Sequence, residues 1–474
     1  MPHAERPVKS ALDLANAIKR KDLSPVEAVQ ACLAVVDRKN PTLNAIIWRR
    51  DEELLREARA AEAALMRGEA TGAFFGVPLP IKDLTEVRGE RVTHGSRITR
   101  DKIGRYDATV IQLLRQAGFL FMGRTNAPEF GTMPVTENEL YGATRNPWNP
   151  AHTPGGSSGG AAAAVASGMA WIAHASDGGG SIRIPAACTG LVGLKPSRGR
   201  VPKGPFLSEV LHGFTTDGCV STTIADTAAF LDAISDCDPN AWYGVPKPAT
   251  SFLAASARQP RRLKIGFTTQ GPLTTTPSAS VVDAVTKTAT LLATLGHEVY
   301  EATVDWSLES EQLARDFLAV WCTSTAYYNF SDWSELEPLN QSLREMAARQ
   351  SSAAYTQAVV RLQMFSRRVV NHWGRDFDLL LTPTIACEPP PIGWLMADAP
   401  GDVEHFSRQC QSFVPYLGWC NITGQPAISL PTAVAASGLP VGAQLVGPPY
   451  GEDLLLMVGR ELEEALDWAA SLPI

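Results

Sequence analysis

The sequence predicts an α/β fold, and three observations support this prediction. Segments with helical capping signals alternate with short apolar segments, as where a helix over 107–117 is followed by a strand over 119–123. The chain returns to short apolar segments typical of strands after residue 376. Hydrophobic residues make up 45% of the 474 residues and charged residues 19%, which supports a sizeable core and argues against disorder.

The first 70 residues are predicted to be helical. Two helices fall within 10–39, and the second has the start signal of a capping box, with Ser24 before the helix, Pro25 in its first position and Glu27 in its third. A charged helix over 49–67 is predicted to end at Gly68. Nothing here is chemically distinctive, so we expect these helices to serve in packing.

A short buried strand is predicted to end at Lys82, after the apolar residues that follow Gly76. Lysines are seldom buried, so this position needs an explanation. One interpretation is a strand-end lysine whose ammonium reaches solvent. The other is a buried lysine whose pKa is lowered so that it can act as a base. The local pattern leaves both open.

Two Gly/Ser clusters, over 155–160 and 178–181, are separated by an Ala-rich apolar segment. A helix over 159–168 and a buried strand over 169–175 are predicted between them. The apolar segment is shorter than the ~20 residues that span a bilayer, and a flexible linker would not carry large apolar residues at its centre. We therefore expect a catalytic or ligand-binding loop, with Ser157 and Ser158 directly before a helix start.

The remaining elements continue the α/β pattern. They are strands over 191–195, 262–267, 297–303, 378–382, 427–430 and 442–446, helices over 224–235, 279–295 and 453–468, a surface connection over 238–260, and a mainly helical region over 308–375. That region carries the aromatic residues Trp321, Tyr327, Tyr328, Phe330 and Trp333. They are either part of the core or one wall of a substrate pocket, and the sequence leaves both open.

Composition and missing motifs exclude several classes of function. The net charge of −7, without a basic run, argues against binding to nucleic acid or to an anionic membrane. No HExxH, GxSxG or GxxxxGK[ST] motif is present, so we expect no catalytic zinc, hydrolase elbow or phosphate-binding loop, and no cofactor. The N-terminal segment has no apolar run, so we expect no signal peptide, and the eight scattered cysteines are expected to be buried free thiols of a cytoplasmic protein.

A lysine, a Ser-Ser pair and a serine in a glycine loop remain as candidate chemistry, because serine attacks only when a base removes its proton. The motifs that carry them resemble the amidase signature family. They are Gly76-Val-Pro-x-x-Ile-Lys82-Asp83, Gly155-Gly-Ser157-Ser158-Gly-Gly160 and Asp177-Gly-Gly-Gly-Ser181-Ile-Arg183-x-Pro185. Their spacings match the family pattern too. The resemblance runs from about residue 10 to the C-terminus and is weakest over 240–375.

This resemblance implies a large mixed β-sheet covered by helices on both faces. It also implies a single amidase domain over 1–474. We divide it into an N-terminal helical segment (1–70), a catalytic core (71–237), a variable helical or substrate region (238–375) and a C-terminal return to the core sheet (376–474).

The family's catalytic triad carries over to three residues. Ser181 would attack and form an acyl-enzyme, Ser157 would follow a cis peptide bond and bridge Ser181 to Lys82, and Lys82 would be a neutral base with its pKa lowered by ~3. The resemblance also assigns an oxyanion hole and a supporting polar network, and we add a substrate pocket. The oxyanion hole comprises the N–H groups of Gly178, Gly179, Gly180 and Ser181, the network Ser158, Asp177 and Arg183, and the pocket Gly131, Met133, Trp321, Tyr327 and Tyr328.

The function that the resemblance implies is hydrolysis of C–N bonds in small hydrophobic, aryl or cyclic amides, with esters or carbamates as further substrates. Two alternatives remain, a glutamine-hydrolysing subunit of an aminoacyl-tRNA amidotransferase and a binding protein on the same fold. The three-glycine loop beginning at Gly178 resembles stand-alone bacterial hydrolases, including those acting on nylon-derived cyclic amides. The expected partner is a small amide, and formation of a homodimer is left open.

Overall fold

Two β-sheets form the centre of the computed structural model, which describes residues 8–306 and 308–473. The strands are β1 (Ile46–Trp48), β2 (Pro78–Lys82), β3 (Leu120–Thr125), β4 (Ile172–Asp177), β5 (Val192–Lys195), β6 (Thr216–Ser221), β7 (Lys264–Phe267), β8 (Glu298–Glu301), β9 (Leu379–Pro383), β10 (Ala427–Val434) and β11 (Pro440–Val446). The larger sheet has the order β4-β6-β5-β10-β11-β9-β7-β8, and the smaller has the order β1-β3-β2. The larger sheet is mixed, because β7 runs parallel to β8 and β9 while the other pairs are antiparallel.

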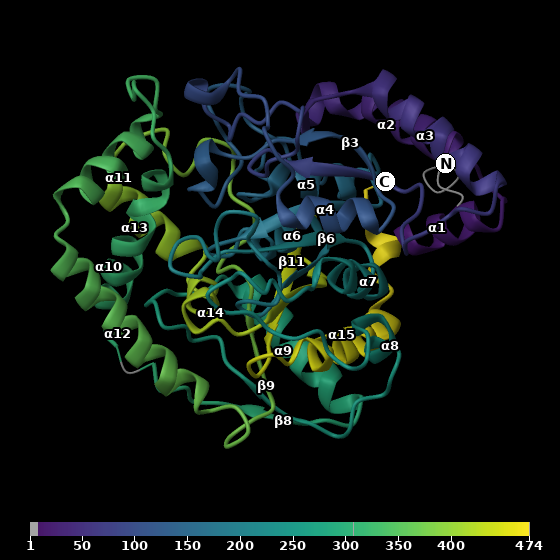
Figure 1. Cartoon of the computed structure of the whole chain (residues 1–474). Helices are drawn as coiled ribbons and strands as arrows, with labels where there is room; N and C mark the ends of the chain where they lie inside the picture. Colours follow the sequence, from purple (N-terminus) through teal and green to yellow (C-terminus); the bar gives the residue numbers. More distant parts are fainter. Residues whose placement is uncertain (1–7, 307, 474) are drawn as a thin grey trace.

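Helices cover both faces of the larger sheet, which confirms the α/β prediction and the architecture that the resemblance implied (Figure 1). They are α1 (Ala11–Lys19), α2 (Pro25–Leu43), α3 (Asp51–Met66), α4 (Thr109–Gln116), α5 (Gly159–Ala166), α6 (Arg183–Thr189), α7 (Ile224–Ile234), α8 (Phe252–Ser256), α9 (Ala279–Thr294), α10 (Ser310–Trp321), α11 (Pro338–Arg349), α12 (Ser352–Val370), α13 (Val403–Phe413), α14 (Gly418–Thr423) and α15 (Glu452–Leu466), with 3₁₀ turns η1 (Arg97–Thr99), η2 (Glu129–Gly131), η3 (Cys322–Tyr327) and η4 (Trp468–Ser471).

Alternation along β9 shows how the two faces are filled. Leu379 and Leu381 pack into the core cluster that contains α7, α9 and α15, whereas Leu380 packs into the cluster formed by α10, α12 and α14. Successive side chains of a strand point to opposite faces, so one apolar strand serves both cores. This explains the run of three leucines in the strand.

The predicted helix signals are largely confirmed. Ser24 and Glu27 form the capping box at the start of α2, and Thr223 caps α7 through the Asp226 N–H. The Asp226 carboxylate instead accepts hydrogen bonds from the first N–H groups of α1, those of Ala11 and Leu12, both at 2.9 Å. The N-terminal helices are thereby tied to the core.

Several elements differ from the prediction. The connection over 238–260 contains the short helix α8, and β1, β6, α6, α13 and α14 were not predicted. Strand β6 carries Asp217 and Gly218, which are poor strand formers, but it is held between β4 and β5 by pairing on both edges. Tertiary pairing has therefore overridden a weak local signal.

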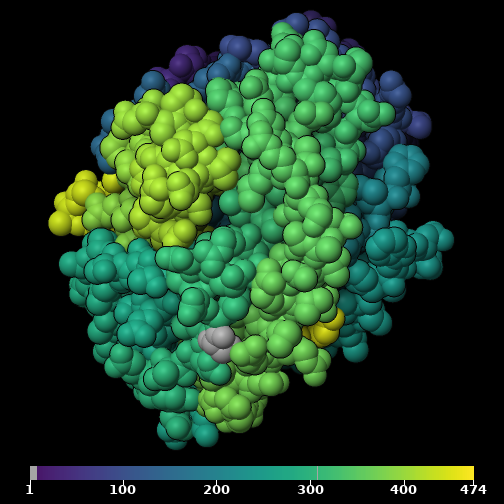
Figure 2. Space-filling model, turned by 90° about the vertical axis from the view of Figure 1, so that its left-hand side faces the viewer, coloured from purple at the N-terminus to yellow at the C-terminus, as the bar shows by residue number. Residues whose placement is uncertain are grey.

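Helices α10, α11, α12 and α13 form a layer at one end of the molecule. Figure 1 shows α10–α13 in green at the end opposite the purple helices α1–α3, and Figure 2 shows the α10–α12 segment beside the yellow-green segment that contains α13.

Among the described residues, no helix is long and apolar enough to cross a membrane. All eight cysteines are free thiols, but Cys237 is exposed and Cys387 and Cys410 are only partly buried, so the predicted burial holds for the other five.

Candidate active site

Three chain segments meet where β2 and β4 end. Lys82 is the last residue of β2, Ser157 and Ser158 precede α5, and the loop that leads to Ser181 follows β4. The Lys82 side chain is completely buried, which excludes the interpretation in which its ammonium reaches solvent. The small sheet thus contributes a buried amine to an edge of the large one.

Lys82 is surrounded by serine hydroxyls. Its Nζ lies 2.7 Å from Ser157 Oγ, 2.8 Å from Ser158 Oγ and 3.1 Å from Ser176 Oγ. The Ser158 hydroxyl donates to the Ser176 carbonyl at 3.2 Å, so its own proton is committed away from the lysine. Ser157 follows a cis peptide bond from Gly156, as the resemblance implied. Of the two remaining hydroxyls, that of Ser157 lies nearer to Lys82 Nζ than that of Ser176, at 2.7 Å against 3.1 Å.

Burial lowers the pKa of Lys82 from 10.5 to about 7, because removing the ammonium from water disfavours the charged form. The carboxylates of Asp177 and Asp217 oppose this effect, and the nearby ammonium of Lys203 adds to it. A large fraction of Lys82 is consequently neutral at neutral pH. This matches the fall of ~3 expected for a lysine that serves as a base.

The glycine loop presents backbone donors beside Ser181. Within the described part of the chain, the N–H groups of Gly178, Gly179 and Ser181 have no hydrogen-bond partner. Gly180 differs from the expectation, because its N–H donates to Asp177 Oδ1 at 2.7 Å. The oxyanion hole stays a prediction, and Gly178, Gly179 and Ser181 are the residues whose N–H groups remain available for it.

Gly180 is also fixed sterically. Its φ is +129°, and a Cβ there would lie 2.7 Å from Leu417 Cδ1. A side chain would meet both a strained backbone and an occupied space. The loop therefore requires glycine at this position to hold Ser181 where it stands.

Asp177 and Arg183 form a fully buried ion pair behind the loop, with Nε–Oδ2 and Nη2–Oδ1 distances of 3.0 Å. Asn421 completes the network, since its Nδ2 donates to Asp177 Oδ1 at 2.9 Å and its Oδ1 accepts from Arg183 at 2.7 Å. Burial alone would raise the pKa of Asp177, but Arg183 and Asn421 hold it below its ordinary value. The carboxylate therefore stays ionised and positions Gly180.

A polar cluster on β4 and β6 was missed by the sequence reasoning. Ser176 pairs with Asp217 across the two strands, and Asp217 Oδ2 accepts from Lys203 Nζ at 2.7 Å. His174 Nε2 lies 3.4 Å from Asp217 Oδ1. The available signal was the polar residues at alternate positions of an otherwise apolar strand, His174 and Ser176. Among the described residues, no group of His, Cys, Asp or Glu side chains could hold a metal ion.

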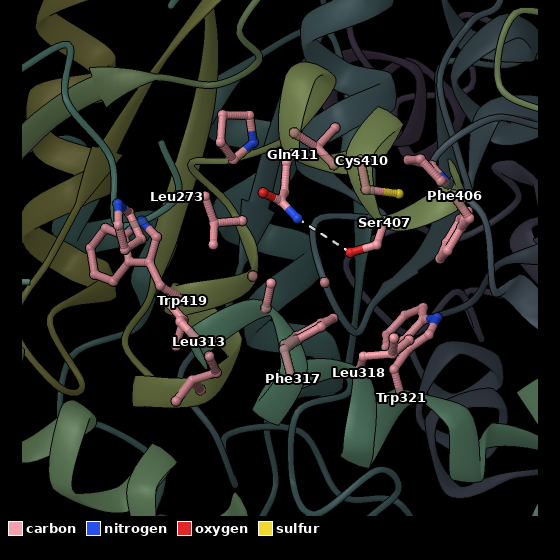
Figure 3. A pocket seen from close by; sticks show the side chains of 18 of the residues that line it. Leu273, Leu313, Phe317, Leu318, Trp321, Phe406, Ser407, Cys410, Gln411 and Trp419 are labelled. Carbon is pink, nitrogen blue, oxygen red and sulfur yellow. Dashed lines mark hydrogen bonds between the residues drawn. The ribbon is translucent and has the colours of Figure 1, made fainter. Parts of the chain in front are cut away.

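Two cavities border Ser181. The first, the narrow cavity, has a volume of about 120 Å³, and Figure 3 shows its lining from α10, α13 and α14. The second, the wide cleft, has a volume of about 1250 Å³. Of the predicted pocket residues, Met133 lines the narrow cavity, Trp321 lines both, and the others line the wide cleft, namely Gly131, Tyr327 and Tyr328.

Comparison with known proteins gives consistent results. Residues 27–456 match the family model described as Amidase. The chain is 34% identical to a 6-aminohexanoate-cyclic-dimer hydrolase of Pseudomonas sp. (strain NK87), over 97% of this chain and 95% of the relative. It is 36% identical to the putative amidase AmiC of Mycobacterium tuberculosis (strain ATCC 25618 / H37Rv), with the same coverage of each chain.

Solved structures agree. A 6-aminohexanoate cyclic dimer hydrolase complexed with substrate superimposes with a TM-score of 0.87 at 31% identity, covering 97% of this chain and 98% of the other. A bacterial aryl acylamidase of the amidase signature family superimposes with a TM-score of 0.88 at 27% identity, covering 98% of each chain.

Proposed function

The chain belongs to the amidase family of enzymes, which act on amide C–N bonds, and we propose that it works through an acyl-enzyme on Ser181. The observation that supports this most is the buried contact of 2.7 Å between Lys82 Nζ and Ser157 Oγ, in a segment whose next residue, Ser158, donates its backbone N–H to the Ser181 carbonyl at 3.3 Å. A neutral amine in contact with a serine hydroxyl is what a Ser–Lys system needs to activate a nucleophile.

In the first half of the proposed reaction, Ser181 Oγ attacks the amide carbonyl carbon. The Ser181 proton passes to Ser157, and the Ser157 proton passes to Lys82, which becomes an ammonium. The carbonyl oxygen becomes an oxyanion held by the N–H groups of Gly178, Gly179 and Ser181. One such donor is worth ~3 kcal/mol in the transition state.

Collapse of this intermediate breaks the C–N bond. Ser157 donates its proton to the leaving nitrogen, which cannot depart as an anion, and Lys82 returns the stored proton to Ser157. Water then attacks the acyl-enzyme, its proton moves toward Ser157 and Lys82, and Ser181 leaves with a proton. The products are a carboxylic acid and an amine, and the enzyme regains its starting state.

The proposed substrates are small hydrophobic, aryl or cyclic amides, with esters and carbamates as further candidates. The apolar narrow cavity next to Ser181 supports a hydrophobic substrate. The similarity to a cyclic-dimer hydrolase and to an aryl acylamidase supports cyclic and aryl amides.

The test uses purified protein with p-nitroanilides and with the 6-aminohexanoate cyclic dimer. We expect hydrolysis that disappears in Ser181→Ala and a fluorophosphonate adduct that mass spectrometry maps to Ser181. The matched control is Ser412→Ala, at an exposed serine, which is expected to keep both properties. Full amidase activity in Ser181→Ala, or an adduct elsewhere, would overturn the proposal.

A further inference from the structure

The two cavities that border Ser181 differ in their lining. The narrow cavity is formed mainly by apolar side chains of α10, α13 and α14, among them Leu313, Phe317 and Phe406. Of the described residues that line it, none is charged, and Ser407 and Gln411 are hydrogen-bonded to each other. The wide cleft is about ten times larger and carries charged residues of both signs.

The proton donor of the proposed reaction lies on one side only. Ser157 lines the wide cleft, not the narrow cavity, whereas Ser181 lines both. The loop donors divide in the same way, since Gly178 borders the wide cleft and Gly179 borders the narrow cavity. The leaving nitrogen must receive its proton from Ser157, so it has to depart from the side of the wide cleft.

We infer that the narrow cavity binds the acyl group and the wide cleft binds the amine, so that the enzyme selects amides of compact, uncharged, apolar acids and tolerates large amines. This inference rests on the proposed function, because it uses the role of Ser157 as the proton donor. It adds the substrate class and the orientation in which the substrate binds.

The size of the narrow cavity sets the acyl preference. Its volume of about 120 Å³ is close to that of an apolar cavity of ~150 Å³ that takes up benzene. It should therefore hold a phenyl ring or a chain of about four or five carbons. Each buried methylene is expected to raise kcat/KM about fourfold until the cavity is full.

The absence of charge in the described lining of the narrow cavity bears on the alternative function. Glutamine carries its ammonium and carboxylate on the acyl side of the bond that a glutaminase cleaves. An uncompensated charge in an apolar cavity is strongly disfavoured. The orientation inferred here therefore argues against hydrolysis of glutamine.

In the wide cleft, six of the charged side chains form three ion pairs with one another. Lys102 contacts Glu86, Arg100 lies 3.1 Å from Glu335, and Lys203 lies 2.7 Å from Asp217. Aromatic rings also line the cleft, and Tyr328 stacks on Phe330 at 5.6 Å. A volume above the ~1000 Å³ usual for small-ligand pockets fits an arylamine or an extended aminoalkyl chain.

Two substrate series test the inference. With p-nitroaniline as the amine, we expect kcat/KM to rise from acetyl to pentanoyl, to remain high for benzoyl, and to fall at least tenfold for decanoyl and for succinyl. With a butanoyl acyl group, amides of arylamines of similar basicity, from aniline to naphthylamine, should differ in kcat/KM by less than tenfold. A flat acyl series, or one in which succinyl exceeds butanoyl, would overturn the inference.

Two variants test which cavity sets the preference for the acyl group and which sets the preference for the amine. Ala314→Leu adds bulk to the narrow cavity and should lower the pentanoyl-to-acetyl ratio of kcat/KM at least tenfold, whereas Leu207→Trp in the wide cleft should leave that ratio unchanged and alter the amine series. A ratio within one variant does not depend on the fraction of protein that folds. A wild-type protein that hydrolyses none of these amides, or hydrolysis that persists in Ser181→Ala, would reject the proposed function. Ser181-dependent hydrolysis with the two variant effects exchanged would reject only the orientation.

Discussion

Replacing Lys82 with methionine should abolish activity and also stabilise the folded protein at low pH. The fall in the pKa of Lys82 from 10.5 to about 7 corresponds to about 5 kcal/mol, the penalty for holding a proton on the buried amine. Methionine removes this penalty and also the contacts of Lys82 with Ser157, Ser158 and Ser176. Ser158 keeps the Ser176 carbonyl and the Ser176 side chain is partly exposed, so the cost falls on the buried Ser157 hydroxyl and is about 1–3 kcal/mol. At pH 6 the variant is therefore expected to be more stable by about 2–4 kcal/mol.

The sign of this effect depends on pH. Below pH 7, Lys82 is protonated in the folded and the unfolded chain, and the penalty is fully present. Between pH 7 and 10.5, the unfolded chain still holds the proton while the folded protein has released it, so the folded state gains as the pH rises. Between pH 7 and 9, the free energy of unfolding of the wild type should therefore rise by about 2 kcal/mol relative to that of Lys82→Met.

Urea unfolding of both proteins from pH 6 to 9 measures this difference, and p-nitroanilide hydrolysis measures the activity, which should fall at least ~10³-fold. The matched control is Lys195→Met. Lys195 is another buried lysine with its pKa lowered to about 7, and its Nζ donates to the Pro196 carbonyl. It should show the same pH trend in stability while keeping the Ser181 adduct. A stability difference between the wild type and Lys82→Met that stays constant from pH 6 to 9 would show that Lys82 keeps its proton and would refute the mechanism.

Three further predictions concern the surroundings of the site. The kcat/KM of an anilide should fall tenfold per pH unit below about pH 7, because Lys82 becomes protonated there. Asp217→Asn removes a carboxylate that favours the protonated Lys82, so it should move the midpoint of this pH profile to lower pH. An unchanged midpoint would contradict this. Gly180→Ala should lower the free energy of unfolding by about 1–3 kcal/mol and should lower kcat at least 100-fold. The control is Gly296→Ala, which should change only stability, because Gly296 has a φ of +103° but open space around it. Equal effects of the two substitutions on kcat would contradict this. Arg183→Lys should lower the free energy of unfolding by about 3–5 kcal/mol, measured in urea, because the buried Asp177 loses its two-point partner; a loss below 1 kcal/mol would contradict this.

The parts of the fold and site that could be predicted are those with local signals. Glycine caps, the capping box at Ser24 and the apolar strand ending at Lys82 depend on neighbouring residues, and the motifs around Ser157 and Ser181 identify the family pattern. The single-domain boundaries and the cytoplasmic location stay predictions, and the formation of a homodimer stays open.

The parts that could not be predicted depend on contacts between distant positions. Asn421 reaches Asp177 across 244 positions, and no periodicity links the two. Asp217 lies in a strand whose local composition disfavours strands, so its place opposite Ser176 follows only from pairing. The hydrogen bond from the Gly180 N–H to Asp177 likewise depends on the backbone conformation of the loop. A run of glycines can adopt many conformations, so the sequence does not predict this one.

The anchors of the glycine loop have a consequence for how the protein is made. Arg183 binds the Leu417 carbonyl, Asn421 and Gln444, which lie more than 230 positions further along the chain. During synthesis, the segment that carries Ser181 leaves the ribosome long before these partners exist. The nascent chain therefore carries its nucleophile without the geometry that makes it reactive. Covalent labelling of Ser181 should consequently report the moment at which the C-terminal strands dock.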